Sequence, residues 1–130
     1  MPDLPLERIL YVEDEPDIRM VAQMALEAVG GFSVQVCSSG AEALQAVESF
    51  GPQLIILDVM MPDMDGPTTL GELRKLPCCT ATPILFMTAK AQPAEVARFL
   101  SLGAIDVIAK PFDPMTLADT IQGIWSRLNG

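Results

Sequence analysis

Short apolar runs alternate with helix-like stretches five times along the 130 residues of the chain. Between the runs, apolar residues recur at the three-to-four spacing of an amphipathic helix. The runs expected to be strands are residues 9–12, 32–37, 54–57, 84–87 and 105–109. Strands separated by helices pair in parallel, and the helices cover both faces of the sheet. The alternation therefore predicts five βα units in one α/β domain of residues 1–130.

The polarity of the runs predicts the order of the strands. Residues 54–57 and 84–87 are wholly apolar, as in strands covered on both faces, whereas residues 32–37 alternate apolar with polar, as at a sheet edge. Five units are too few for an eight-stranded barrel, which leaves an open doubly wound sheet. We expect a flavodoxin-like three-layer sandwich with a parallel five-stranded sheet in the order 2-1-3-4-5, which places the second strand at an edge.

Turn and capping residues predict where the helices begin and end. Ser39 and Glu42 have the spacing of a capping box, Gly30-Gly31 should stop the first helix, and Asp113-Pro114 should open the last one. The last helix should face the core with Leu117, Ile121, Ile124, Trp125 and Leu128.

Composition excludes several classes of function. The formal charge is −9 with eight Lys and Arg, so we expect neither direct nucleic-acid binding nor binding to anionic membranes. The absence of histidine excludes His-based general bases and Ser-His triads. Three cysteines without framework spacing, no signal-peptide pattern and no membrane-length apolar run predict a cytoplasmic protein with reduced thiols.

Polar residues stand where four of the predicted strands end: Glu13, Asp14, Asp58, Thr88 and Lys110. The carboxyl ends of parallel strands share one rim, and the first and third strands are neighbours in the expected order. Glu13, Asp14 and Asp58 should then lie in one small pocket. Close carboxylates repel one another, so the cluster needs raised pKa values or a cation, and Mg²⁺ favours such oxygen ligands.

The rim residues suggest phosphoryl chemistry. Asp58 leads straight out of a rigid buried strand, which suits a nucleophile, and aspartyl phosphate is a known covalent intermediate. Lys110 and a bound Mg²⁺ can neutralise the charge of the incoming group, and the Thr88 hydroxyl can donate a hydrogen bond to it.

Four strings together resemble the receiver domain of two-component response regulators: ILYVEDE at 9–15, LDVMMPDMDG at 57–66, MTAK at 87–90 and KPF at 110–112. The resemblance covers nearly the whole chain. It implies that Asp58 accepts a phosphoryl group from a histidine kinase or a histidine phosphotransfer protein, as a signal receiver rather than a turnover enzyme. It also implies a switch on the surface of the fourth helix, fifth strand and fifth helix, which a downstream partner or output domain would read.

The resemblance implies a role for each rim residue. Asp14 would ligate Mg²⁺ directly, Glu13 partly through water, and Met60 through its backbone carbonyl. Thr88 would move toward the phosphoryl group and Lys110 would pair with it. The Lys110-Pro111 bond would be cis.

Three other functions remain open. A flavin or nucleotide module would need a phosphate-cradling loop after the first strand, where this chain has Glu13-Asp14-Glu15. A haloacid-dehalogenase-like phosphohydrolase would need a second Asp at the position of Met60. A receiver-like scaffold without a switch is favoured only by Val107, which stands where the family often has an aromatic residue and is stiff at χ1.

Overall fold

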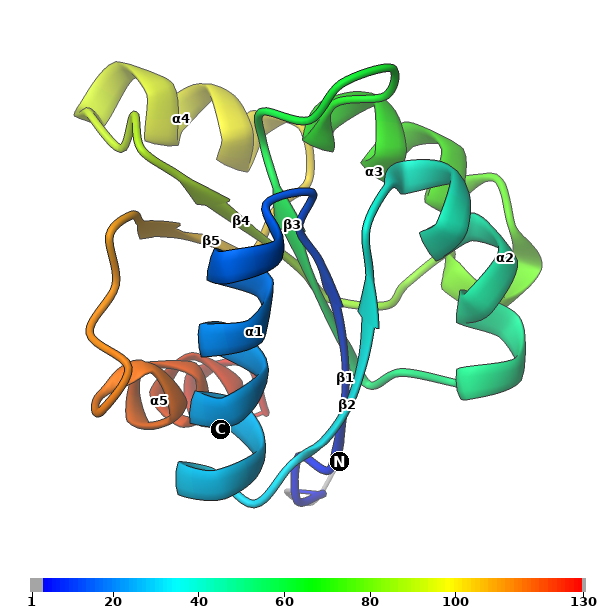
Figure 1. Cartoon of the computed structure of the whole chain (residues 1–130). Coiled ribbons are helices and arrows are strands. Elements are labelled where there is room, and N and C mark those ends of the chain that lie inside the picture. Colours follow the sequence, from blue (N-terminus) through cyan, green and yellow to red (C-terminus); the bar gives the residue numbers. More distant parts are fainter. Residues whose placement is uncertain (1–3, 130) are drawn as a thin grey trace.

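The computed structural model describes residues 4–129, in which five parallel strands form one sheet in the order β2-β1-β3-β4-β5 (Figure 1). The strands are β1 (Arg8–Val12), β2 (Ser33–Cys37), β3 (Leu54–Asp58), β4 (Ile84–Thr88) and β5 (Asp106–Ala109). This is the predicted flavodoxin-like order. Every residue of β3 and β4 is buried, whereas Ser33 and Gln35 of β2 are exposed, as expected for central and edge strands.

Helices cover both faces of the sheet and make two hydrophobic cores (Figure 1). The helices are α1 (Pro16–Met24), continued by a π-helical turn η1 (Ala25–Val29), α2 (Gly40–Phe50), α3 (Gly66–Arg74), the 3₁₀ turn η2 (Pro77–Cys79), α4 (Pro93–Ser101) and α5 (Leu117–Asn129). Side chains of α1 and α5 pack on one face with Ile9 and Tyr11, and those of α2, α3 and α4 pack on the other with Leu10 and Val12. Because successive side chains of β1 point to opposite faces, one strand serves both cores.

The structure differs from the predictions at the two ends of α5. Asp113 opens a turn rather than the helix itself: its carbonyl accepts the N–H groups of Thr116 and Leu117, and the helix begins at Leu117. Leu128 was expected to face the core, but it is 45% exposed. It lies on the correct stripe of α5, beside an open hollow that it lines with Ile105 and Ile124, so its side chain is only partly covered.

The edge strand also differs from its predicted pattern at its last residue. The alternation along residues 32–37 predicts that Cys37 shares the polar face of β2 with Ser33 and Gln35, yet Cys37 is 1% exposed. It pairs with Val12 of β1 and belongs to the core beneath α2 and α3.

The capping-box prediction at the start of α2 is confirmed. The Ser39 hydroxyl accepts the Glu42 N–H at 3.1 Å, and the Glu42 carboxylate accepts the N–H of Ser38 at 2.6 Å.

The start of α3 lies against the end of β3, and this contact requires glycine at residue 66. A Cβ on Gly66 would stand 2.7 Å from the carbonyl oxygen of Asp58 and 2.9 Å from Val59 Cα. We predict that Gly66→Ala lowers the free energy of unfolding by about 1–3 kcal/mol, because the backbone after Asp58 must shift. Urea unfolding measures the change.

Gly71 provides the control, because it lies in the same helix with open space around it. Gly71→Ala should raise the free energy of unfolding by about 0.5–1 kcal/mol through helix propensity. If the two variants changed stability equally, the close approach at Gly66 would have no energetic consequence.

Candidate phosphoacceptor and metal site

Glu13 and Asp14 directly follow β1, in a loop held by backbone hydrogen bonds. The Glu13 N–H donates to the Cys37 carbonyl at 3.0 Å, continuing the pairing of β1 with β2. The Glu13 carboxylate is fully buried and accepts the N–H of Glu15 at 3.2 Å, while Asp14 is partly exposed. The loop therefore presents one buried and one accessible carboxylate at the rim.

Asp58 is the last residue of β3 and is 3% exposed. The next residue is fixed, because the Val59 N–H donates to the Met87 carbonyl of β4 at 3.1 Å. One carboxylate oxygen from each of Glu13, Asp14 and Asp58 lies within 4.8 Å of the other two. The structure thus brings together the three acids that the sequence placed on one rim.

Lys110 follows β5 and points its ammonium group into the acidic cluster. Its Nζ lies 2.9 Å from Glu13 Oε1 and 2.9 Å from Asp58 Oδ1. Burial acts to lower the pKa of Lys110, but the hydrogen bonds and charges of Asp58 and Glu13 outweigh it and raise the pKa. Lys110 therefore carries a positive charge at neutral pH. The Lys110-Pro111 bond is cis, as the family resemblance implied.

Thr88 and Met60 lie at the rim but outside this ion-pair network. The Thr88 hydroxyl is buried and accepts the Lys90 N–H at 3.0 Å; none of the contacts described for residues 4–129 joins it to Asp58. The Met60 side chain is 69% exposed, so a role at the acidic cluster would fall to its backbone carbonyl.

The charge of Asp58 is incompletely compensated. Burial raises the pKa of Asp58 to about 6, the Glu13 charge adds to the rise, and Lys110 opposes it. Asp58 Oδ1 is buried, and the Lys110 ammonium beside it also donates to Glu13 Oε1, so one cation is shared between two carboxylates. A hard divalent cation fits such an oxygen in a cluster of three carboxylates.

The sequence model of the response regulator receiver domain matches residues 9–122. The chain belongs to this family. Receiver domains act in two-component signalling, which confirms the resemblance drawn from the sequence.

Individual relatives agree with this assignment. The chain is 37% identical over 123 residues to the probable transcriptional regulator ycf27 of Guillardia theta, covering 95% of this chain and 47% of that protein. It is 35% identical over 120 residues to the transcriptional regulatory protein TrcR of Mycobacterium tuberculosis, covering 92% and 46%. The chemotaxis protein CheY4 of Vibrio cholerae superposes with a TM-score of 0.84 at 31% identity, covering 92% of this chain and 99% of that one. The chain thus spans about half the length of ycf27 and TrcR and nearly all of CheY4.

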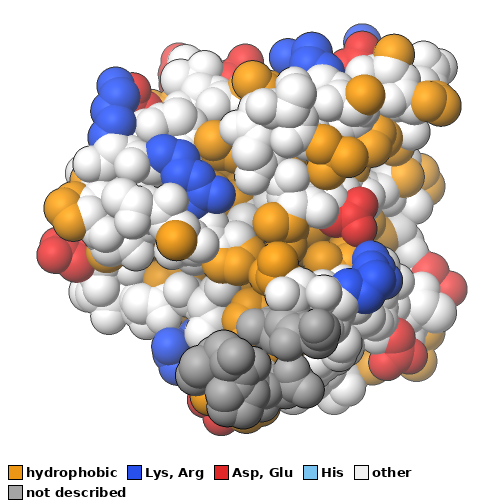
Figure 2. All heavy atoms as spheres, turned by 180° about the vertical axis from the view of Figure 1, so that it is seen from behind, with side chains coloured by type: hydrophobic (Ala, Val, Ile, Leu, Met, Phe, Trp, Pro, Cys, Tyr) orange, Lys and Arg blue, Asp and Glu red, His pale blue; other side chains and the backbone are white. Residues whose placement is uncertain are grey.

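That coverage limits one sequence-based prediction. The expected absence of nucleic-acid binding rests on the acidic charge of these 130 residues, and the relatives named as transcriptional regulators have a further half that the chain does not match. Figure 2 shows Lys and Arg side chains standing apart on the face that it displays, without a continuous basic stripe. The charge argument therefore applies to the receiver domain and does not extend to a longer protein.

No helix among residues 4–129 is long and apolar enough to cross a membrane.

Sequence reasoning missed two residues that contact the acidic loop. The Arg19 guanidinium donates to the carbonyl of Glu13 at 2.8 Å and that of Asp14 at 3.4 Å. Tyr11 is fully buried, and its hydroxyl lies 3.5 Å from Glu13 Oε1; burial, followed by the Glu13 and Asp58 charges, raises its pKa. The period of two along β1 places Tyr11 on the same face as Glu13, and that signal was present in the sequence.

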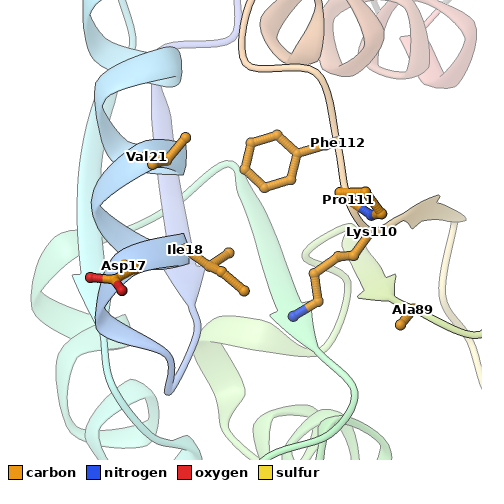
Figure 3. A pocket seen from close by; sticks show the side chains of 7 residues that line it. All are labelled: Asp17, Ile18, Val21, Ala89, Lys110, Pro111 and Phe112. Atoms are coloured by element: carbon orange, nitrogen blue, oxygen red, sulfur yellow. The ribbon is translucent and has the colours of Figure 1, made fainter.

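A groove opens beside the acidic cluster, between α1 and the segment after β5. It has a volume of ≈ 550 Å³. Figure 3 shows Ile18 and Val21 of α1 facing Phe112, with the Lys110 side chain reaching past Ile18 toward the end of β3. Val21 is 42% exposed. The receiver domain therefore has an open apolar surface directly next to its acidic site.

Asp58 gives the domain a specific pH dependence in the absence of metal. Its folded-state pKa of about 6 lies above its ordinary value of 3.8, so between these values the folded state binds more protons than the unfolded state. The contribution of Asp58 to the free energy of unfolding is therefore present at low pH and is lost as the pH rises through about 6. We predict that Asp58→Asn, without divalent ions, raises the free energy of unfolding by about 2 kcal/mol at pH 8 and changes it little at pH 4.

Urea unfolding at the two pH values measures this difference. Asp63→Asn is the matched control, because Asp63 is an exposed acid in the loop after the same strand. It should show no such pH dependence. An Asp58→Asn effect of equal size at pH 4 and pH 8 would contradict the raised pKa.

Proposed function

We propose that residues 1–130 form a single phosphoacceptor receiver domain that takes a phosphoryl group on Asp58 with Mg²⁺ bound nearby. The observation that supports this most is the gathering of Glu13, Asp14 and Asp58 within 4.8 Å, with Lys110 2.9 Å from two of them. A bound Mg²⁺, held by Asp14, Asp58, the Met60 carbonyl and, through water, Glu13, would neutralise part of the charge on the phosphoryl oxygens.

In the proposed transfer, an oxygen of Asp58 forms a bond to phosphorus while the P–N bond of a donor phosphohistidine breaks. The bonding electrons leave with the imidazole nitrogen, which then takes a proton. Asp58 is positioned for attack because β3 and the Val59–Met87 hydrogen bond fix its backbone. Lys110 stabilises the charge that develops on the phosphoryl oxygens, and Thr88 turns its hydroxyl from Lys90 toward them.

The direct test is uptake of phosphate from acetyl phosphate, a small donor, followed by intact mass. We expect an increase of one phosphoryl group that requires Mg²⁺ and is lost in alkali, as for an acyl phosphate. An unchanged mass in the presence of Mg²⁺ would contradict the proposal. In this role the domain is a cytoplasmic signal receiver and has no turnover of outside substrates.

The groove next to Lys110 suggests where the donor protein lies. Its apolar lining from α1, Pro111 and Phe112 borders the acidic cluster, so a donor helix packed there would bring its phosphohistidine to Asp58 (Figure 3). The donor is a histidine kinase or a histidine phosphotransfer protein. We predict that Val21→Glu slows transfer from such a donor by about tenfold, as for loss of an interface contact worth about 1.4 kcal/mol.

Val29→Glu is the matched control, because Val29 is 49% exposed at the end of the same helical stretch and does not line the groove. The Val29→Glu variant should receive the phosphoryl group from the donor protein at the wild-type rate. Both variants should take phosphate from acetyl phosphate normally, since that donor needs no docking surface. Equal slowing in the two valine variants would remove the groove from the proposal.

The output of the proposed switch is the surface of α4, β5 and α5. A hollow of ≈ 440 Å³ lies there between β5 and α5, lined in part by Val107, Ile124 and Arg127, so side chains have room to repack. A downstream partner or attached output domain that binds the repacked surface better would shift the population toward it.

A receiver-like scaffold without a switch is the second candidate function, because Val107 occupies the usual aromatic position. Partner affinity with and without beryllofluoride, a phosphoryl mimic, distinguishes the two. A switch gives unequal affinities, and a scaffold gives equal ones.

A further inference from the structure

Two adjacent cysteines lie on the turn between α3 and β4, in a part of the fold that the acidic site does not use. Cys78 is exposed, Cys79 is 1% exposed, and their sulfur atoms lie 3.6 Å apart. Both belong to the 3₁₀ turn η2. An exposed thiol is therefore in contact with a buried one.

The turn is held in place by hydrogen bonds to its backbone. Arg74 Nη1 donates to the carbonyl oxygen of Cys79 at 2.9 Å and to that of Thr82 at 2.6 Å. The Cys79 N–H donates to the Leu76 carbonyl at 2.9 Å. Cys79 also belongs to the core that contains Leu73 and Ile84. These contacts fix the backbone that carries the two thiols and the place of Cys79 in the core.

The separation of the sulfur atoms suits a bridging atom better than a disulfide. Adjacent Cα atoms are about 3.8 Å apart, which is below the range of about 4.4–6.8 Å found across disulfides. Two sulfurs bonded at about 2.3 Å to one thiophilic atom, at a near-tetrahedral angle, stand about 3.8 Å apart. The observed 3.6 Å is close to that value.

We propose that Cys78 and Cys79 form a two-thiol site that binds monosubstituted trivalent arsenicals. Such a compound needs two protein thiolates, because its organic group occupies the third position on arsenic. Two thiols cannot satisfy an ion that requires three or more protein ligands. Within residues 4–129, the one group of at least three metal-binding side chains is the acidic cluster.

The binding reaction is substitution without oxidation. Each thiol sulfur forms a bond to arsenic as an As–OH bond breaks, and the thiol proton leaves with the hydroxide as water, so two S–As bonds form and two waters are released. The exposed Cys78 reacts first, because burial and then the neighbouring Cys78 raise the pKa of Cys79 to about 11. Cys79 then closes the ring within the same molecule.

The test is titration of the reduced protein with phenylarsine oxide. We expect one arsenical per chain by intact mass, with loss of two of the three free thiols. A dithiol such as dithiothreitol should release it, and a monothiol at the same thiol concentration should not. Cys78→Ser should weaken binding on the order of 10²–10⁴-fold, because it removes the intramolecular second bond.

Cys37→Ser is the matched control and should leave binding unchanged, because Cys37 is buried at the end of β2 rather than in η2. Cys79→Ser should weaken binding as Cys78→Ser does. If circular dichroism shows that Cys79→Ser is unfolded, the test rests on Cys78→Ser alone. Release by the monothiol, or tight binding by Cys78→Ser, would overturn the proposal. Binding by Asp58→Asn should equal the wild type, which separates this site from the proposed function.

Discussion

Asp58→Asn is expected to reduce phosphoryl uptake from acetyl phosphate to the background of a protein-free sample. The amide of asparagine keeps the shape of the side chain but is not a nucleophile, and it also removes one charge from the acidic cluster. Intact mass after incubation with Mg²⁺ and acetyl phosphate measures the uptake. Folding is not expected to limit the result, because the same variant should be more stable than the wild type at neutral pH.

Asp63→Asn serves as the control for this experiment. Asp63 is exposed and has a positive φ of 68°, a conformation that asparagine tolerates well. It should take up one phosphoryl group at the wild-type rate. Normal uptake by Asp58→Asn, or loss of uptake in Asp63→Asn, would show that the nucleophile is a different residue.

Asp14→Asn is expected to lower the affinity for Mg²⁺ by at least about 10–100-fold, the range found when only an outer partner of a metal ligand is removed. Asp14 is the more accessible of the two cluster acids that follow β1, and none of the ion pairs described for residues 4–129 involves it, whereas Glu13 is already paired with Lys110. Calorimetric titration with MgCl₂ measures the affinity, and the Mg²⁺ concentration for half-maximal uptake from acetyl phosphate should rise in parallel.

Glu15→Gln is the matched control for Asp14→Asn. Glu15 lies in the same loop, but it is exposed and outside the cluster of three carboxylates. It should change the affinity for Mg²⁺ little, since solvent and salt screen an exposed charge. Equal losses in the two variants would show that Mg²⁺ responds to the total negative charge of the loop rather than to a ligand at Asp14.

The arrangement of the strands and the gathering of the acids were predictable because both follow from short repeating patterns. The uniformly apolar β3 and the alternating β2 predict a centre and an edge, and a parallel sheet then brings the residues after β1 and β3 to one rim. Thr88 and Lys110 were placed on that rim by the same argument. Their individual roles in phosphorylation stay predictions.

Other features depended on packing that the pattern of residue types does not contain. Leu128 has the period of a core residue, but exposure depends on whether another element covers the end of α5. The double contact of Lys110 depends on the path of the chain after β5, which brings one ammonium group between two carboxylates. The groove beside α1 likewise arises from two segments that are remote in sequence.

A crystal structure of the protein with Mg²⁺ and beryllofluoride tests most directly whether the acidic cluster holds a cation that assists attack by Asp58. We expect beryllium bonded to a carboxylate oxygen of Asp58, and Mg²⁺ at about 2.0–2.1 Å from oxygens of Asp14, Asp58 and the Met60 carbonyl. Lys110 and Thr88 should contact the fluorides. Mg²⁺ bound away from these carboxylates, or beryllofluoride absent from Asp58, would contradict the account.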